Sequence, residues 1–472
     1  MGIDMESVDT TTGSEDKPLL EAEKGNQRFP WVSLAIFLVL QILIAVPEGM
    51  LQTLSVQFAR SAFASERNVT LPVGVNACAT SPHESSELAD VQAAVALFAT
   101  YQSCLKDFIP VLTALPLIAL ADFTGRRPVL LLICLGGLVV TTGFLIVSFF
   151  EISVYYTLVG SAVFGVCGGF ILLNSISMLY VTDIVPKEHR GVALAMIYAF
   201  ENVVIYLGPL VINVLLEALS SYTICFLIPA CSALLACLWM LPPDLVQESV
   251  KKQPLDLGVA SGIGHGICRL FTDTFSVRLV VLLACDSVVN LLVEGFDNTM
   301  SLYGLGEPFC WSPTLLGVFS VVHGVPHSLA APLIVWVIEL FLSDYWLIYI
   351  SILSSIAQFL LTAVATSNEV LIYGASLVGI FAGVSQPVFV SLITRLVDTK
   401  FHGALFSMYS LVYGASTTFS LILQSAAYSF TVSAGLNVVI FYAMASLSAL
   451  VLVPTICMHI LEPKDGFDDK SP

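Results

Sequence analysis

Charged residues are scarce in this sequence. Asp, Glu, Lys and Arg make up only 11% of its 472 residues, whereas a soluble domain carries about a quarter. The 18 Lys and Arg residues form no basic stripe, which argues against a nucleic-acid partner. The first thirty residues are polar and acidic and lack the apolar core of a signal peptide.

Two kinds of chemical motif are also missing. No G-x-x-x-x-G-K-[ST] occurs, so the sequence lacks the phosphate-binding loop of an ATP-driven pump. No nucleophile–base or paired-aspartate motif of an intramembrane enzyme can be recognised. We therefore expect no enzyme activity and no bound cofactor.

Apolar residues, in contrast, are abundant, at 57% of the chain. Runs of about 20 such residues recur along its length, each long enough to cross a bilayer core of roughly 30 Å. We predict an all-α membrane protein with twelve transmembrane helices in two six-helix bundles, 31–241 and 279–459, joined by a central loop, 242–278, and flanked by tails, 1–30 and 460–472. The helices are expected near 31–55, 92–121, 128–150, 154–181, 191–216, 221–241, 279–303, 313–337, 345–366, 370–394, 403–429 and 435–459.

The positive charges indicate how these helices are oriented. Lys and Arg collect in the short cytoplasmic loops of membrane proteins. Cytosolic termini put both tails, the central loop and short loops such as Arg126–Arg127 in the cytoplasm, and leave only Arg60 and Arg67 outside. We therefore predict a multi-pass protein with both termini in the cytosol.

The loop after the first helix has features of an extracellular or lumenal segment. Asn68-Val69-Thr70 is an acceptor sequon, so we expect glycosylation at Asn68. Nine of the eleven cysteines fall in spans or the cytoplasmic loop, and Cys78 and Cys310 fall in outside loops. An oxidising compartment would permit a disulfide between these two. The alternative is two unrelated free thiols.

The stretch between the second and third predicted helices carries a family signature. LADFTGRRP, Leu120–Pro128, resembles the signature loop of the major facilitator superfamily, and TDIVPKEHRG, Thr182–Gly191, resembles the matching loop after helix 4. The resemblance implies the fold of that superfamily. It also implies an ion network that closes the cytoplasmic mouth and whose ion pairs separate when this end opens. The alternative is that these residues are solvated loop charges without a gating role. The gate residues would be Asp122, Arg126, Arg127, Asp183 and Arg190.

Two stretches in the second half narrow the resemblance. LYGLGEPFCWSPTLLGVFS, Leu302–Ser320, and HGALFSMYSL, His402–Leu411, are similar to motifs of the proton-coupled folate transporter family, solute carrier family 46. This resemblance implies proton-coupled transport but no particular solute, because members are associated with folates, haem, cyclic dinucleotides, peptidoglycan fragments and conjugated steroids. Folate-handling members place a cation in helix 10 after a Pro-Val pair. None follows Pro387-Val388 within this helix before Arg395, which argues against folate.

Ionisable and polar groups inside the predicted helices are the candidate transport residues. Such groups are expensive in a bilayer and usually face a cavity. Burial disfavours the charged form of a carboxyl group, which can then take up a proton on the acidic side. The candidate proton-coupling residues are Glu201, which we favour, Asp286, Glu294, Asp297 and Glu48. By resemblance helices 1, 4, 7 and 10 line the path, and the candidate cavity residues are Lys106, Gln52, Asn174, Asn290, His323 and Gln386.

Each of these residues also has a purely structural alternative. Lys106, the only cation within a span, would pair with an acidic residue on another helix or bind an anionic substrate. His323 and His327 share a helix face, but no third metal ligand is evident, so we predict no metal site. We interpret these histidines as pore-lining or packed residues.

The N-terminal tail contains a sorting pattern. Glu15 precedes Leu19 and Leu20 in EDKPLL, an acidic dileucine motif that a clathrin adaptor would read, which leaves the plasma membrane and endolysosomal membranes as locations. We predict a secondary active transporter that moves a small organic, anionic solute together with protons by alternating access, with the proton gradient as its energy source. The alternative is a non-transporting receptor or scaffold that keeps the fold.

Overall fold

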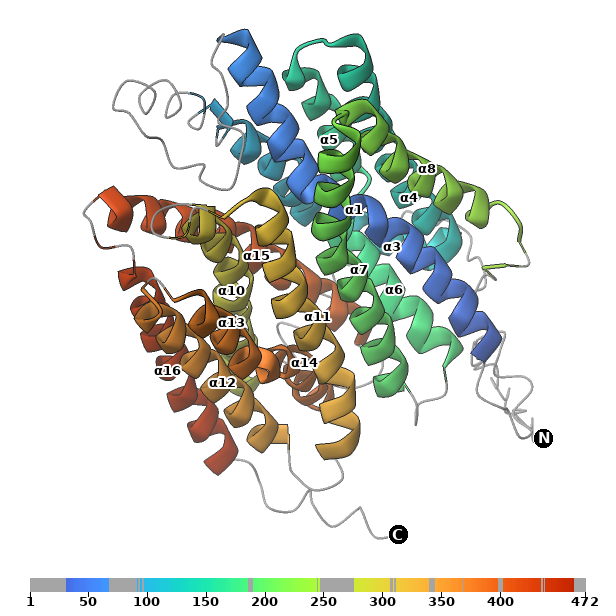
Figure 1. Cartoon of the computed structure of the whole chain (residues 1–472). Coiled ribbons are helices and arrows are strands. Elements are labelled where there is room, and N and C mark those ends of the chain that lie inside the picture. Colours follow the sequence, from blue (N-terminus) through green and yellow to red (C-terminus); the bar gives the residue numbers. More distant parts are fainter. Residues whose placement is uncertain are drawn as a thin grey trace, which may run out of the picture.

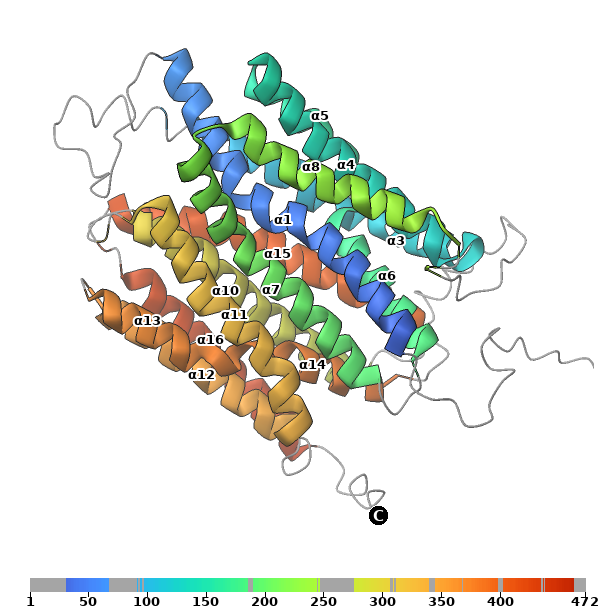
Figure 2. The same cartoon turned by 45° about the vertical axis from the view of Figure 1, so that its right-hand side comes forward.

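A computed structural model describes residues 31–67, 91–185, 190–246, 276–338, 344–397 and 402–461, apart from positions 92, 93, 96, 244, 306–308, 310, 367, 434, 435 and 437. Every regular element within these ranges is a helix. The chain forms two bundles, one from its N-terminal half (blue to green) and one from its C-terminal half (yellow to red), as Figures 1 and 2 show.

The N-terminal half consists of long apolar helices and short irregular turns. They are α1 (Trp31–Glu66), the π-helical turn η2 (Cys104–Phe108), α3 (Ile109–Thr124), α4 (Arg126–Phe150), the 3-10 turn η3 (Val154–Tyr156), α5 (Thr157–Val166), α6 (Gly169–Ile184), α7 (Arg190–Leu219) and α8 (Tyr222–Met240). Gly125, at φ 99°, separates α3 from α4 and forms the tight turn of the GRRP loop. The first helix runs eleven residues beyond its predicted end at 55.

The C-terminal half is built in the same way. It contains α10 (Val277–Leu305), α11 (Pro313–Ile338), α12 (Asp344–Val364), α13 (Glu369–Val378), the 3-10 turn η5 (Gly379–Val384), α14 (Ser385–Arg395), α15 (His402–Ser433) and α16 (Val439–Ile460).

Two predicted helices are interrupted rather than continuous. The helix expected at 154–181 breaks between α5 and α6, where Gly168 and Gly169 have φ values of 94° and 54°. Glycine adopts this backbone region readily, whereas other residues are strained there. The helix expected at 370–394 tightens into η5 between α13 and α14. Each half therefore has an irregular turn within its fourth predicted span.

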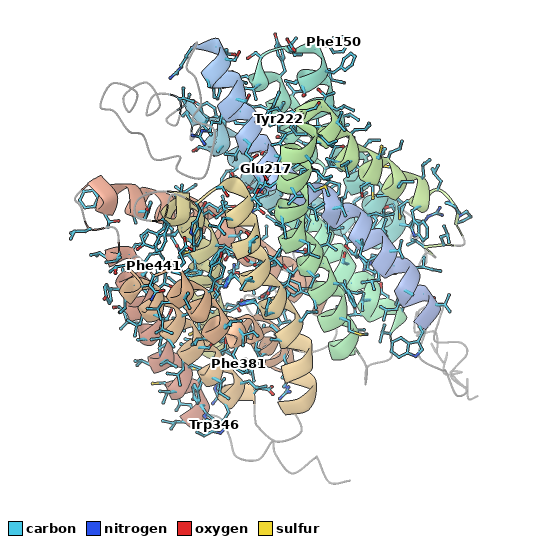
Figure 3. The ribbon with its side chains drawn as sticks, viewed as in Figure 1. Phe150, Glu217, Tyr222, Trp346, Phe381 and Phe441 are labelled. Carbon is cyan, nitrogen blue, oxygen red and sulfur yellow. The ribbon has the colours of Figure 1, made fainter. Side chains whose placement is uncertain are left out.

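Nine helical segments among the described residues are long and apolar enough to cross a membrane. The other three predicted spans coincide with α3 and its preceding turns, with α11 and with α15. Many large apolar side chains are exposed, including Phe150 and Trp346, which lie at opposite ends of the molecule in Figure 3. Apolar surface of this extent fits contact with lipid.

The two halves meet along glycine-containing helices. Among the described residues, two apolar core clusters lie in the N-terminal half and two in the C-terminal half. Between the halves α7 lies along α11, as both views show, and α15 contacts α3 and α6. A Cβ atom on Gly317 of α11 would lie only 2.9 Å from the Cα atom of Leu210 on α7. Because glycine has no side chain, the backbones of α7 and α11 can approach each other closely at this position.

Candidate functional site

A cluster of charged residues lies where α1, the π-helical turn and α7 meet. Lys106 from the turn forms an ion pair with Glu48 of α1. The side chains of Lys106 and Glu48 are only 18% and 22% exposed. Turns of this type are frequent at functional sites. Of the two partners that the sequence left open for Lys106, the structure supplies the acidic residue on another helix.

Glu201 of α7 completes this cluster. Its side chain is 3% exposed, and Glu48 is the charged group that faces it. Its Oε1 atom is buried and accepts no hydrogen bond from any described residue. Close helix packing brings the two carboxyl groups together: a Cβ atom on Gly49 would lie 2.7 Å from the carbonyl oxygen of Ile205, and one on Gly208 would lie 2.6 Å from the carbonyl carbon of Gly49.

The acidic helix α10 faces a stripe of hydroxyl groups on α15. The Tyr413 hydroxyl donates to Glu294 Oε1 at 3.4 Å, and Asn290 Nδ2 donates to Thr417 Oγ1 at 3.2 Å. Asp286 is buried beside Tyr409. Because the three α15 residues are four apart, they lie on one face of that helix.

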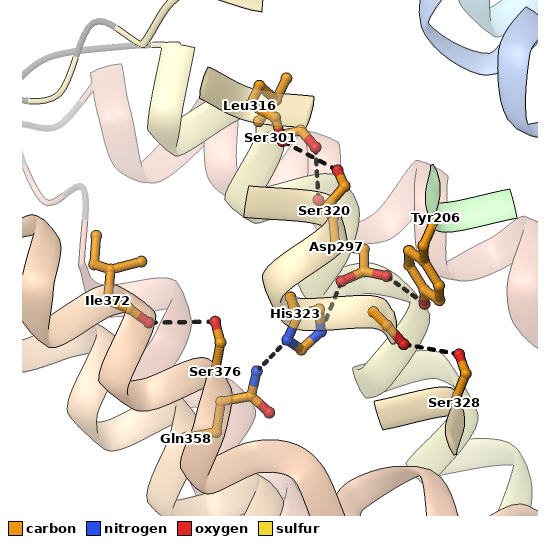
Figure 4. Close-up of polar contacts among 11 residues, drawn as sticks. Tyr206, Asp297, Ser301, Leu316, Ser320, His323, Ser328, Gln358, Ile372 and Ser376 are labelled. Atoms are coloured by element: carbon orange, nitrogen blue, oxygen red, sulfur yellow. Dashed lines mark hydrogen bonds and ion pairs between the residues drawn. The ribbon is translucent and has the colours of Figure 1, made fainter. Parts of the chain in front are cut away.

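A third polar group joins the two halves (Figure 4). The Tyr206 hydroxyl of α7 donates to Asp297 Oδ2 at 3.0 Å, and His323 Nε2 of α11 lies 3.1 Å from Asp297 Oδ1. His323 Nδ1 lies 3.4 Å from Gln358 Nε2 of α12. His327 lies one turn further along α11, with its ring centroid 5.7 Å from that of His323. Among the residues that the structure describes, no group of three His, Cys, Asp or Glu side chains could hold a metal ion.

The remaining predicted cavity residues differ in exposure. Gln52 of α1 is exposed, and Asn174 of α6 and Gln386 of α14 are half-buried. Gln386 lies close to the Tyr409 hydroxyl.

The residues of the expected gate are partly described. Arg126 Nε lies 3.5 Å from Asp183 Oδ2, which links the start of α4 to the end of α6. Arg127 donates to the carbonyl oxygens of Met240 and Leu241, each at 2.8 Å, and so binds the end of α8. A comparable pair with reversed charges, Arg395 and Asp344, links α14 to α12 at 2.9 Å. The side chains of Asp122 and Arg190 lie outside the described residues, as do Asn68, Cys78, Cys310, Glu15, Leu19 and Leu20.

Sequence reasoning missed the partners of the acidic residues. Tyr206, Tyr413 and Gln358 form hydrogen bonds to the predicted site residues Asp297, Glu294 and His323, respectively. None of these three partners is among the predicted site residues. The four-residue spacing of Tyr409, Tyr413 and Thr417 was the one available signal in the sequence.

Comparison with known proteins finds relatives among membrane transporters. The model of the Major Facilitator Superfamily matches residues 87–293. The proton-coupled folate transporter of Bos taurus is 24% identical over 348 residues, which cover 73% of this chain and 74% of that protein. The lysosomal proton-coupled steroid conjugate and bile acid symporter of Mus musculus is 24% identical over 388 residues, which cover 80% of this chain and 83% of that protein.

Solved structures agree on the fold. The human organic anion transporter MFSD10 superposes with a TM-score of 0.64 at 17% identity, covering 91% of this chain and 99% of that one. The proton:xylose symporter XylE superposes with a TM-score of 0.63 at 12% identity, covering 92% of this chain and 96% of that one. The resemblance inferred from the GRRP loop and the second-half motifs is confirmed. The chain matches the model of the Major Facilitator Superfamily over residues 87–293 and has the fold of that superfamily, and its sequence relatives include transporters named as proton-coupled.

Proposed function

We propose that this chain is a symporter that moves a small organic anion together with protons by alternating access of two rocking halves. The observation that carries the proposal is the cluster of Lys106, Glu48 and Glu201. It contains one cation that an anion can bind and neighbouring carboxyl groups that a proton can bind, with Asp107 as a further acidic neighbour of Lys106 and Glu48. Two sequence relatives are named as proton-coupled transporters, which supports the same coupling.

The coupling follows from the competition for Lys106. A carboxylate or sulfate of the solute can bind Lys106 at low cost only when one of the acidic groups beside Lys106 becomes neutral. Otherwise two anionic groups would crowd one ammonium in a poorly hydrated site. Glu201 faces Glu48, so a proton on Glu201 removes the repulsion between these two carboxyl groups. Proton uptake and anion binding therefore favour each other, and by linkage each strengthens the other to the same degree.

The same cluster explains how the carrier could change back to its starting conformation without bound solute. Without solute, the Lys106–Glu48 ion pair leaves no unpaired cation at this point, and a neutral Glu201 adds no charge.

We propose Gln52, Asn174, Asn290, His323 and Gln386 as further residues of the solute path. Asp286 and Glu294, which face α15, are further candidates for proton binding.

We further propose that the Arg126–Asp183 ion pair forms part of a gate at the cytoplasmic mouth, together with Asp122, Arg127 and Arg190. With both termini in the cytosol, the EDKPLL motif would be accessible to a clathrin adaptor, and the carrier would reside in the plasma membrane or in endolysosomal membranes. An Asp122→Asn variant that reaches its membrane and transports normally would contradict the gate.

Reconstitution in proteoliposomes tests the transport proposal. We expect an inward proton gradient to stimulate uptake of at least one labelled organic anion among folate, a steroid sulfate and a bile acid. Glu201→Gln should lose this stimulation but keep solute exchange in the absence of a gradient, because its side chain is permanently neutral. Glu66→Gln is the matched control, since Glu66 is an exposed carboxyl group at the end of α1, away from the cluster. Uptake of every anion that ignores the gradient would refute symport.

A further inference from the structure

The hydrogen bond from Tyr206 to Asp297 has no role in the mechanism above, although it connects the two halves directly. We propose that Tyr206 is a positioning residue that couples the protonation of the Asp297–His323 pair to separation of α7 from α11. The proposal rests on the proton-coupled transport proposed above and extends it to the C-terminal half.

The geometry gives each oxygen of Asp297 one donor from a different half. Tyr206, in the N-terminal half, donates to Oδ2, and His323, in the C-terminal half, donates to Oδ1. The Tyr206 bond therefore crosses the seam between the halves, whereas the His323 bond stays within one half. The ring of Phe319 stacks on His323 with an interplanar angle of 7° and a centroid separation of 5.7 Å, which restrains the orientation of the imidazole.

Gln358 allows this pair to hold either protonation state. An amide group can donate an N–H to the unprotonated Nδ1 atom of a neutral imidazole, or turn over and accept from a protonated one. The Nδ1 atom of the buried His323 ring therefore has a hydrogen-bond partner in either state. A buried nitrogen without such a partner would destabilise the structure. The pair is therefore built to change its charge without a rearrangement of its surroundings.

The charge of the pair decides the strength of the bond across the seam. With a neutral His323 the pair carries one negative charge, and a proton on either member makes it neutral overall. Hydrogen bonds to a charged acceptor are roughly twice as strong as those between neutral groups. A proton on Asp297 removes the charged acceptor, whereas a proton on His323 places a positive charge beside that acceptor, and in both cases the attraction for the Tyr206 hydroxyl falls.

Two other titratable groups face the pair. Glu294 lies about one turn away on α10, where Tyr413 bonds to it and where its carboxyl group interacts with that of Asp297. His327 lies next to His323 on α11, and a positive charge there would oppose uptake. Each affects how readily the pair is protonated, but neither bonds to Tyr206 itself.

The surrounding seam makes this bond important for separation. Gly317 and Gly324 place α11 directly against α7, and the Tyr206 ring lies against Gly324. The seam also contains a hydrogen bond from Thr314 Oγ1 to Glu217 Oε2, 3.1 Å long, at the exposed end where α7 ends and α11 begins (Glu217 is labelled in Figure 3). Since Glu217 and Thr314 touch when this end is closed, cysteines at these positions can report whether it is closed.

The test is a crosslinking experiment on the full-length protein in proteoliposomes. A Glu217→Cys/Thr314→Cys parent carries a protease site in the central loop, so that a short bifunctional thiol reagent keeps the cleaved halves together on a gel. Single-cysteine versions measure the background from native cysteines. We expect crosslinking to fall severalfold between about pH 7.5 and 5.5, the range in which histidine titrates. Tyr206→Phe and Asp297→Asn should give low crosslinking at both pH values.

Tyr222→Phe is the matched control, because the Tyr222 hydroxyl donates at 3.3 Å to the Gln57 carbonyl oxygen within the N-terminal half. It should behave like the parent. His327→Gln should keep the pH response, although its midpoint can move. Crosslinking of Tyr206→Phe equal to that of the parent, or a parent that ignores pH, would overturn the inference. Either result would leave gradient-driven uptake, and with it the proposed function, unaffected, because crosslinking requires no solute.

Discussion

Replacement of Lys106 by Met tests the central ion pair most directly. The substitution removes the charge but keeps a flexible apolar side chain of similar length. Glu48 then loses its cationic partner while the carboxyl group of Glu201 still faces it. Removing one partner of a buried ion pair costs about 3–5 kcal/mol, because the remaining charge is uncompensated.

Partial exposure reduces this cost. The two side chains are 18% and 22% exposed, and solvent screens the remaining charge, so we expect Lys106→Met to lower the free energy of unfolding by roughly 2–3 kcal/mol. The double variant Lys106→Met/Glu48→Gln removes both charges. It should lie within about 1 kcal/mol of the parent, because exchanging a whole buried ion pair for neutral groups is often close to neutral.

Transport should respond differently from stability. Both variants lack the cation that would bind the solute, so we expect gradient-driven anion uptake to be lost in both. The free energy of unfolding can be measured by denaturant titration in mixed micelles, and uptake can be measured on the same preparations in proteoliposomes. Equal destabilisation of the single and double variants would refute the pairing of Lys106 with Glu48. Uptake retained by the double variant would refute Lys106 as the anion site.

Two further predictions concern packing and the outside loops. Gly208→Ala places a Cβ atom 2.6 Å from the Gly49 carbonyl carbon, so the resulting overpacking should cost about 1–3 kcal/mol and lower the Tm in detergent. Gly374→Ala, where no atom lies within 4 Å of the new Cβ, should keep or slightly raise the Tm, because alanine stabilises a helix relative to glycine, and equal Tm values for both variants would contradict a tight α1–α7 crossing. Thiol labelling of Cys78 and Cys310 in the native protein should rise after reduction if they form a disulfide, and equal labelling before and after would show two free thiols.

The fold could be predicted from the sequence because lipid imposes a simple requirement. A span must be long and apolar, and cations must gather on one side, so composition alone located most of the helices. The breaks at Gly168 and in η5 could not be found in this way. Glycine in a membrane helix commonly serves close packing, and the sequence does not distinguish such a glycine from one with positive φ.

The candidate site could be predicted only on its charged side. Glu48, Glu201 and Asp297 stand out because a carboxyl group in an apolar helix is costly and therefore conspicuous. A tyrosine hydroxyl or a glutamine amide costs far less, so Tyr206 and Gln358 produced no comparable signal. Pairing also depends on how each helix is rotated about its axis relative to its neighbours. Lys106 therefore had two open interpretations until the packing of α1 against the π-helical turn was known.

The position of the two polar groups on α7 suggests how the halves communicate. Glu201 and Tyr206 are five residues apart, which places them about 140° apart around a helix of 3.6 residues per turn. Glu201 therefore faces Glu48 in its own half, while Tyr206 faces Asp297 in the other. The crossing at Gly49 and Gly208 leaves little room for α7 to move relative to α1, so α7 moves with the N-terminal half. A change of charge in either group then acts on the same rigid helix, and relative motion must occur at the α7–α11 seam, where Tyr206 lies.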